Sequence, residues 1–258
     1  MNLHDAVVQS CDVYFYRLAV TLGIERLNTY LAGHGFGSPT GVDINGESKG
    51  LLPTEDYRRK RRMEWLPGET VITGIGQGAL LATPLQLATA MAGIANRGLR
   101  PQPVMVAAFE DPASKRRAPL PPAPARPSDS YTPEQIETMV RNLTDVVHGE
   151  GGTARGIGWN APYKIAGKTG TAQVKGLKQG ESYSESRTAA HLRDHAMFIA
   201  LAPVDDPKIA VAVIVENGGH GGSAAAPIAR KVMDQYLLGN TGASGAIPVK
   251  VTDGDGAD

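Results

Sequence analysis

The run Lys-Thr-Gly-Thr at positions 168–171 holds the groups that an acyl-transfer site requires. The ammonium group of Lys168 would stabilise an alkoxide and attract a substrate carboxylate. The hydroxyls of Thr169 and Thr171 would bind that carboxylate, and the backbone N–H of Thr171 would serve as an oxyanion donor. Gly170 would let a substrate lie flat against a strand edge, where a side chain would obstruct it.

A second motif, Ser-Cys-Asp at positions 10–12, offers a hydroxyl and a carboxylate. In acyl transfer the nucleophile loses a proton and the leaving amine gains one, and a hydroxyl beside ammonium groups can relay that proton. A Ser-x-Asp pattern alone occurs by chance in most chains. Ser10 and Asp12 become informative because they precede the run at 168–171, with one motif on a predicted helix and the other on a predicted strand.

The sequence lacks the serine nucleophile that belongs with these motifs. In this chemistry a serine lies three residues before a lysine, and no lysine of the chain has serine at that position. Lys164 has Ala161 there, for example, and Lys168 has Ile165. We therefore expect Met1 to be an internal methionine of a longer reading frame. The in-frame codons upstream would test this: a stop codon next to Met1, with no Ser-x-x-Lys further upstream, would contradict it.

The two motifs and several other segments resemble class B penicillin-binding proteins, and within them the elongation group. The resemblance covers about residues 1–238, and Asp12 stands where the family more generally has Asn. Relative to the family, the Ser-x-x-Lys segment, the N-terminal dimerisation region and the membrane helix are missing. The segments that carry the resemblance are residues 10–16 (SCDVYFY), 74–78 (GIGQG), 83–86 (TPLQ), 164–173 (KIAGKTGTAQ), 192–195 (LRDH) and 216–219 (ENGG).

The resemblance implies a peptidoglycan D,D-transpeptidase. Such enzymes form an acyl-enzyme at serine, expel D-alanine and pass the peptide to a neighbouring amine, and β-lactams mimic the D-Ala-D-Ala end. It implies that Ser10 relays a proton, that Asp12 occupies a hydrogen-bonding position toward the substrate amide, and that residues 168–171 form the carboxylate and oxyanion strand. Without the nucleophile we expect the chain alone to be inactive, and a fragment that only binds peptide or a partner remains the alternative.

The resemblance also implies partners and a location. The expected ligands are peptidoglycan stem peptides and β-lactams. The expected protein partners are a membrane glycosyltransferase and elongation-complex proteins. The expected location is the periplasmic face of the bacterial inner membrane, with the anchor helix outside this chain. No metal, organic cofactor or nucleic acid is implied.

Composition excludes several other classes of protein. Lys and Arg total 26 and Asp and Glu total 26, so the zero net charge argues against a dedicated nucleic-acid binder. The basic run at residues 58–62 is therefore interpreted as a solvated loop face. Cys11 is the only cysteine, which excludes internal disulfides. The sequence has no apolar run long enough to span a membrane, and its first residues lack the pattern of a secretory signal.

Hydrophobic periodicity and capping signals predict the elements that must position these residues. We predict a layered α/β domain, incomplete at its N-terminus, in which helices flank an antiparallel sheet. We expect a domain over residues 1–238, a disordered tail at 239–258, and poor solubility because the sheet lacks strands. Helices are predicted at residues 3–18, 25–32, 83–94, 132–147 and 224–238, strands at 163–174, 196–202 and 209–215, a surface loop at 112–127, and irregular structure at 35–70.

Four short patterns allow other interpretations. Residues 74–79 match a relaxed dinucleotide fingerprint, but no acidic residue lies between Glu69 and Glu110 to bind a ribose. Residues 162–169 nearly match a phosphate-binding loop. Residues 191–195 are similar to a zinc-protease motif, although a capped, partly buried His195 is favoured. The glycine-rich residues 218–223 are interpreted as a turn rather than an anion cradle.

Overall fold

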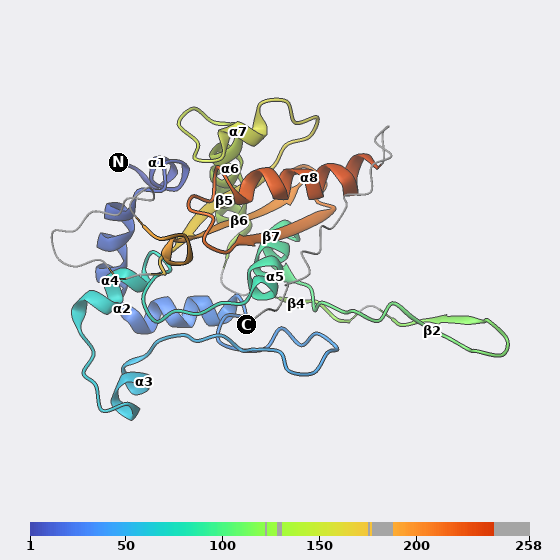
Figure 1. The fold of residues 1–258 in the computed structure, drawn as a ribbon, viewed down its shortest axis with the longest axis horizontal. Coiled ribbons are helices and arrows are strands. Elements are labelled where there is room, and N and C mark those ends of the chain that lie inside the picture. The colour runs from blue at the N-terminus through green and yellow to red at the C-terminus, as the bar shows by residue number, and fades with distance from the viewer. Residues whose placement is uncertain (122, 128–130, 175, 177–187, 240–258) are drawn as a thin grey trace, which may run out of the picture.

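The computed structural model describes residues 1–121, 123–127, 131–174, 176 and 188–239, and its centre is a three-stranded antiparallel sheet. The strands are β5 (Ala166–Ala172), β6 (His195–Ala202) and β7 (Ile209–Val215), in the order β5-β6-β7 (Figure 1). The apolar residues of β6 and the β-branched residues of β7 favour strands, and a short turn joins the two, whereas β5 forms despite its two glycines. All three predicted strands are confirmed.

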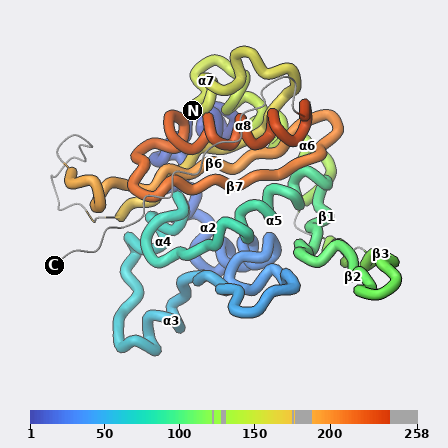
Figure 2. The backbone as a smooth tube through the Cα atoms, turned by 45° about the vertical axis from the view of Figure 1, so that its right-hand side comes forward, coloured from blue at the N-terminus to red at the C-terminus, as the bar shows by residue number. Residues whose placement is uncertain are grey.

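Helices cover both faces of this sheet, as Figure 2 shows. Helix α8 (Ala225–Leu238) packs on β6 and β7 from one side, and α5 (Pro84–Ala95) packs on the same strands from the other. Helix α6 (Pro133–His148) lies against β5, followed by the short α7 (Arg155–Gly158). The predicted layered arrangement of helices on an antiparallel sheet is therefore confirmed.

Two clusters of buried apolar residues hold these layers together. The larger cluster joins the sheet to α6, α7 and α8, and it includes Phe198, Val146 and Met233, all with 0% of their surface exposed. The smaller cluster joins the sheet to α5 and includes Met91 and Leu201. Helix α6 packs on β5 and β6 pairs with it along its whole length, so these two elements fix its position.

The helices α5 and α6 both begin with a capping box, as predicted. The Thr83 hydroxyl accepts from Gln86 N (3.1 Å), and Gln86 Oε1 accepts from Thr83 N (2.8 Å). Thr132 and Gln135 repeat the arrangement at the start of α6. In each helix proline follows the threonine, where its missing N–H costs no intrahelical bond.

The start of the chain differs from the prediction of one helix over residues 3–18. Helix α1 covers Leu3–Val8, and helix α2 covers Asp12–Gly33. The break between the two helices is at Ser10, whose φ is +55°. Cys11 N donates to Ala6 O (2.9 Å) and Ser10 N donates to Val7 O (3.3 Å), which is the pattern of a Schellman helix end. The helix predicted at residues 25–32 is the second part of α2, beyond a kink at Gly23.

Residues 35–70, for which the sequence predicts irregular structure, contain two short helices. Helix α3 (Glu55–Lys60) is capped by Thr54, whose side chain accepts from Tyr57 N (3.0 Å). Helix α4 (Pro67–Thr73) begins with proline and packs on α2. Both helices are shorter than two full turns, so their sequences carry little periodic signal.

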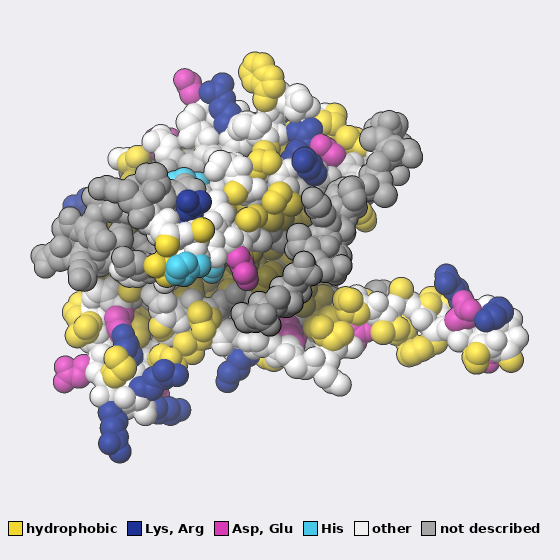
Figure 3. All heavy atoms as spheres, viewed as in Figure 1, with side chains coloured by type: hydrophobic (Ala, Val, Ile, Leu, Met, Phe, Trp, Pro, Cys, Tyr) yellow, Lys and Arg dark blue, Asp and Glu magenta, His cyan; other side chains and the backbone are white. Residues whose placement is uncertain are grey.

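Between α5 and α6 the chain forms an arm that projects from the body (Figure 1). Strands β1 (Leu99–Arg100) and β4 (Arg126–Pro127) pair at its base, and β2 (Ala108–Glu110) and β3 (Arg117–Pro119) pair further out. Figure 3 shows charged side chains at its tip, where Arg117 Nε lies 3.2 Å from Glu110 Oε2. The loop predicted at residues 112–127 does lie at the surface, but it belongs to this hairpin arm.

Two remaining predictions concern the ends and the membrane. The tail predicted at residues 239–258 lies outside the described residues from position 240 onward. Among the helices that the structure describes, none combines the length and the apolar character that crossing a bilayer requires.

Candidate active site

A cleft of about 910 Å³ lies at the free edge of β5, and it collects all six residues that the sequence analysis singled out. Its walls come from the start of α2, from the turn that follows α4, from β5 and from the turn that precedes α8. These segments are far apart in the sequence, so only the folded chain forms the cleft. Its lining residues are Ser10, Asp12, Phe15, Tyr16, Ile72, Gly74, Ile75, Gln77, Thr153, Lys168, Thr169, Gly170, Thr171, Gln173, His220, Gly221, Gly222 and Ser223.

Lys168 and Ser10 are in direct contact in this cleft. Lys168 Nζ donates to Ser10 Oγ (2.8 Å) and to the carbonyl of Thr169 (3.0 Å). Ser10 reaches Lys168 because the chain turns sharply between α1 and α2. The contact joins an ammonium group to a hydroxyl, which is the arrangement that a proton relay needs.

Burial makes the ammonium group of Lys168 more acidic than that of an exposed lysine. Removal from water lowers the pKa of the Lys168 ammonium group to about 8, and the negative charge of Asp12 opposes this shift. The group is therefore still largely protonated at neutral pH, but it gives up its proton far more readily than an exposed lysine. Asp12 is the first residue of α2, where the helix dipole favours a carboxylate.

Two threonine hydroxyls face each other beside Lys168. Thr169 Oγ1 lies 2.7 Å from Thr153 Oγ1, and Thr153 precedes α7. A hydroxyl pair next to an ammonium group can bind an anionic oxygen. Sequence reasoning did not identify Thr153, because no local pattern places it near residue 169.

Glycines bring the turn before α8 into the site. A side chain at Gly221 would place its Cβ 2.6 Å from the Gly170 carbonyl oxygen, and one at Gly222 would overlap the Thr153 carbonyl oxygen. The turn predicted at residues 218–223 is present, and it is packed closely enough to form one wall of the cleft. A side chain at Gly170 itself would bring its Cβ to 3.3 Å from Met197 Cβ, which is a tight contact.

Gln77 is a further site residue, to which the sequence analysis did not assign a role. Its Nε2 donates to the carbonyl of Thr171 (2.6 Å), and its Oε1 accepts from the backbone N–H of Gln173 (3.2 Å). Gly76 and Gly78 on either side have φ of +77° and +75°, a conformation that favours glycine. Gly76 and Gly78 were the sequence signal for this site residue, because they allow the tight turn that directs the Gln77 side chain toward β5.

The nucleotide-binding interpretations of the sequence are wrong. The run Gly167-Lys168-Thr169 lies inside strand β5, whereas a phosphate-binding loop would open a helix. The glycine-rich residues 74–79 follow helix α4 rather than a strand.

The zinc-protease interpretation also lacks structural support. His195 begins β6, and its Nδ1 accepts from Asn217 N (2.9 Å). No group of three His, Cys, Asp or Glu residues is placed to hold a metal ion within the described part of the chain.

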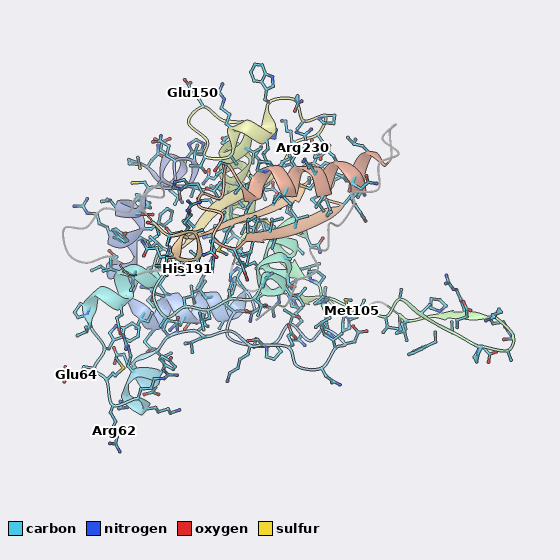
Figure 4. All side chains as sticks on the ribbon, viewed as in Figure 1. Arg62, Glu64, Met105, Glu150, His191 and Arg230 are labelled. Carbon is cyan, nitrogen blue, oxygen red and sulfur yellow. The ribbon has the colours of Figure 1, made fainter. Side chains whose placement is uncertain are left out.

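The basic run at residues 58–62 lies at the tip of the loop that carries α3. Arg58 Nε donates to Glu69 Oε2 (3.0 Å), Arg59 pairs with Asp56, and Arg61 lies over the Tyr57 ring (4.6 Å to its centre). Arg62 points away from the body of the protein (Figure 4). Three of the five charges therefore have partners between Asp56 and Glu69.

The chain is similar to known proteins over nearly its whole length. The family described as "Penicillin binding protein transpeptidase domain" matches residues 1–234. The "Peptidoglycan D,D-transpeptidase MrdA" of Acinetobacter baumannii is 45% identical over 242 residues, which cover 92% of this chain. The match covers 35% of that relative, so the chain spans about a third of its length.

Solved structures agree with this similarity. Penicillin-binding protein 2 (PBP2) of Pseudomonas aeruginosa, solved in complex with WCK 5153, superposes with a TM-score of 0.75 at 40% identity, covering 97% of this chain and 52% of that one. Helicobacter pylori PBP2, solved in complex with MreC, gives a TM-score of 0.77 at 31% identity, covering 93% and 41%. The fold, the motifs and the family match together place this chain in the penicillin-binding protein transpeptidase family.

Proposed function

We propose that the chain forms the substrate side of a serine D,D-transpeptidase that cross-links peptidoglycan. The observation that carries the proposal is the 2.8 Å contact between Lys168 Nζ and Ser10 Oγ at the free edge of a strand that bears Thr169 and Thr171. The nucleophilic serine would come from a Ser-x-x-Lys segment outside these 258 residues. The family membership and the relatives named peptidoglycan D,D-transpeptidase support the reaction class.

In the first half of the reaction the serine oxygen bonds to the carbonyl carbon of the penultimate D-alanine. The bond from that carbon to the nitrogen of the terminal D-alanine breaks. The N–H of Thr171 stabilises the oxyanion, and Lys168 with Thr169 holds the terminal carboxylate. The serine proton moves to the leaving amine, and Ser10, in contact with Lys168, lies on the route.

In the second half an amine from a neighbouring stem peptide attacks the acyl-enzyme. The new amide bond forms, the serine–carbon bond breaks, and the serine regains a proton by the reverse route. β-Lactams would enter the first half only, because the acyl-enzyme they form retains the leaving group within its own ring system.

The proposal extends to partners and location. Helicobacter pylori PBP2 has been solved with MreC, and another similar structure is described as a peptidoglycan synthase complex that coordinates polymerization and crosslinking. By analogy this chain would work beside elongation-complex proteins and a membrane glycosyltransferase, at the periplasmic face of the inner membrane.

Labelled penicillin tests the proposed reaction. The 258-residue chain should form no covalent adduct, whereas a protein that joins it to its Ser-x-x-Lys segment should be labelled. Lys168→Ala in that longer protein should slow labelling roughly a hundredfold to a thousandfold, since it removes one charge contact of the transition state. A stable adduct on the isolated chain would reveal a nucleophile within it. Normal labelling of the Lys168→Ala protein would contradict the role of the Lys-Thr-Gly strand.

A further inference from the structure

The side-chain amide of Gln77 occupies the free edge of β5 in the way that a neighbouring strand would. It donates to Thr171 O (2.6 Å) and accepts from Gln173 N (3.2 Å), so it uses both a carbonyl and an N–H of the strand. It reaches β5 from the turn after α4, and its own backbone N–H donates to Ile72 O (3.0 Å). Gln77 is therefore held at both its backbone and its side chain.

These contacts identify which backbone groups of β5 face the cleft. In an antiparallel ladder the N–H and C=O of one residue point to the same side, and successive residues alternate. The carbonyl of Thr169 accepts from Lys168 Nζ, and the carbonyl of Thr171 accepts from Gln77 Nε2. The backbone N–H and C=O groups of both threonines therefore point away from β6. The N–H of Thr171 consequently points into the cleft as well.

The direction in which the acyl donor lies along β5 follows from the charge of its terminal carboxylate. This step rests on the proposed function. The terminal carboxylate binds at the cation, Lys168, and the reacting carbonyl binds at the N–H of Thr171. The rest of the donor must then run toward Gln173, antiparallel to β5. In that register the amide N–H of the reacting residue meets Thr171 O, and a carbonyl two residues earlier meets the N–H of Gln173.

We infer that Gln77 occupies, in the free protein, the two backbone positions that the amide groups of the acyl donor require. Gln77 is a specificity-determining residue: a donor with an amide N–H next to its reacting carbonyl displaces the glutamine amide from Thr171 O. A donor without that N–H forms no hydrogen bond with Thr171 O, so it does not displace the glutamine amide. The free protein keeps both groups hydrogen-bonded, so neither is left unpaired while the site is empty.

The test compares two β-lactams on the longer protein that includes the Ser-x-x-Lys segment. Benzylpenicillin has an acylamino N–H beside its reacting carbonyl, and a carbapenem has a hydroxyethyl group there instead. Gln77→Ala should raise the acylation rate constant for benzylpenicillin roughly threefold to tenfold relative to the carbapenem, the effect of one hydrogen bond. Gln77→Glu should shift the ratio in the same direction, because a carboxylate oxygen cannot donate to Thr171 O.

Two results would overturn the inference. Equal loss of rate with both β-lactams, without loss of fold by chemical denaturation, would show that Gln77 only supports β5. An unchanged ratio would show that Thr171 O serves donor and glutamine at once.

A second measurement separates the failure of this inference from the failure of the proposed function. If the unsubstituted longer protein is not acylated, the proposed function fails. The longer protein is then titrated with diacetyl-L-lysyl-D-alanyl-D-alanine, and hydrogen exchange of the Gln77 side-chain NH₂ is followed by NMR. Loss of protection on peptide binding is expected. Protection that persists with bound peptide, or a peptide that does not bind, would overturn the inference.

Discussion

At the scale of single residues, Ser10 holds its hydroxyl against Lys168 from a backbone conformation that favours glycine. It is the left-handed residue of the Schellman end of α1, with φ of +55°. A side chain in this conformation costs roughly 1–2 kcal/mol relative to the ordinary helical region. Glycine at this position would avoid the strain, but it would also remove the hydroxyl that accepts a hydrogen bond from Lys168 Nζ.

This strain predicts different stabilities for two variants that lose the same hydroxyl. Ser10→Gly should be more stable than Ser10→Ala by about 1 kcal/mol, because only glycine enters the left-handed region without cost. Both variants should slow penicillin acylation of the longer protein to a similar extent. Denaturant titration and labelling rates measure the two effects. Equal stabilities would show that the break between α1 and α2 is not strained.

At the scale of elements, α5 anchors the irregular segment that precedes α3. Gln86, which closes the capping box of α5, is buried, with 2% of its surface exposed. Its Nε2 donates to the carbonyls of Ser38 (2.8 Å) and Lys49 (2.9 Å). One side chain therefore caps a helix and also pairs two backbone groups from a segment without regular structure.

The two capping boxes of the chain provide a matched pair of variants. Gln86→Ala should destabilise the protein by about 3 kcal/mol, because it leaves three backbone groups without partners in a buried place. Gln135→Ala, in the exposed box of α6, should cost about 0.5–1 kcal/mol. Chemical denaturation measures both. Hydrogen exchange near residues 38–49 should accelerate only in Gln86→Ala, and similar losses in the two variants would contradict the anchoring role.

At the scale of the whole molecule, two apolar regions lack cover among the described residues. Among the strands that the structure describes, β7 pairs with β6 alone. On α2, Val13 and Val20 lie seven residues apart, on one face, and are 64% and 65% exposed. Open strand edges and apolar faces of this kind favour pairing with other chains.

We therefore expect the isolated 258-residue chain to self-associate. Sedimentation velocity should show species that grow with concentration, and thermal unfolding should be broad. The longer protein with the Ser-x-x-Lys segment is the control, and it should melt more sharply. A monomeric isolated chain with a sharp, cooperative melt would contradict the expectation.

Local sequence signals were enough to predict the elements that depend on near neighbours. The capping boxes before α5 and α6 use residues three positions apart, and the strands β6 and β7 are continuous apolar runs, so both signals are local. The spacing of apolar residues did not reveal the break at Ser10. A left-handed serine is unfavourable locally, and it is retained by a contact with Lys168, 158 positions along the chain.

The motifs Ser10-x-Asp12 and residues 168–171 indicated the chemistry through residue type alone, because residue types fix which groups can carry a proton or a charge. Their geometry and their neighbours follow from the folded chain. It placed Thr153 against Thr169, and it put the Gln77 amide on the edge of β5. These contacts join residues distant in sequence, and no local propensity encodes them, since they depend on how the helices and the sheet pack.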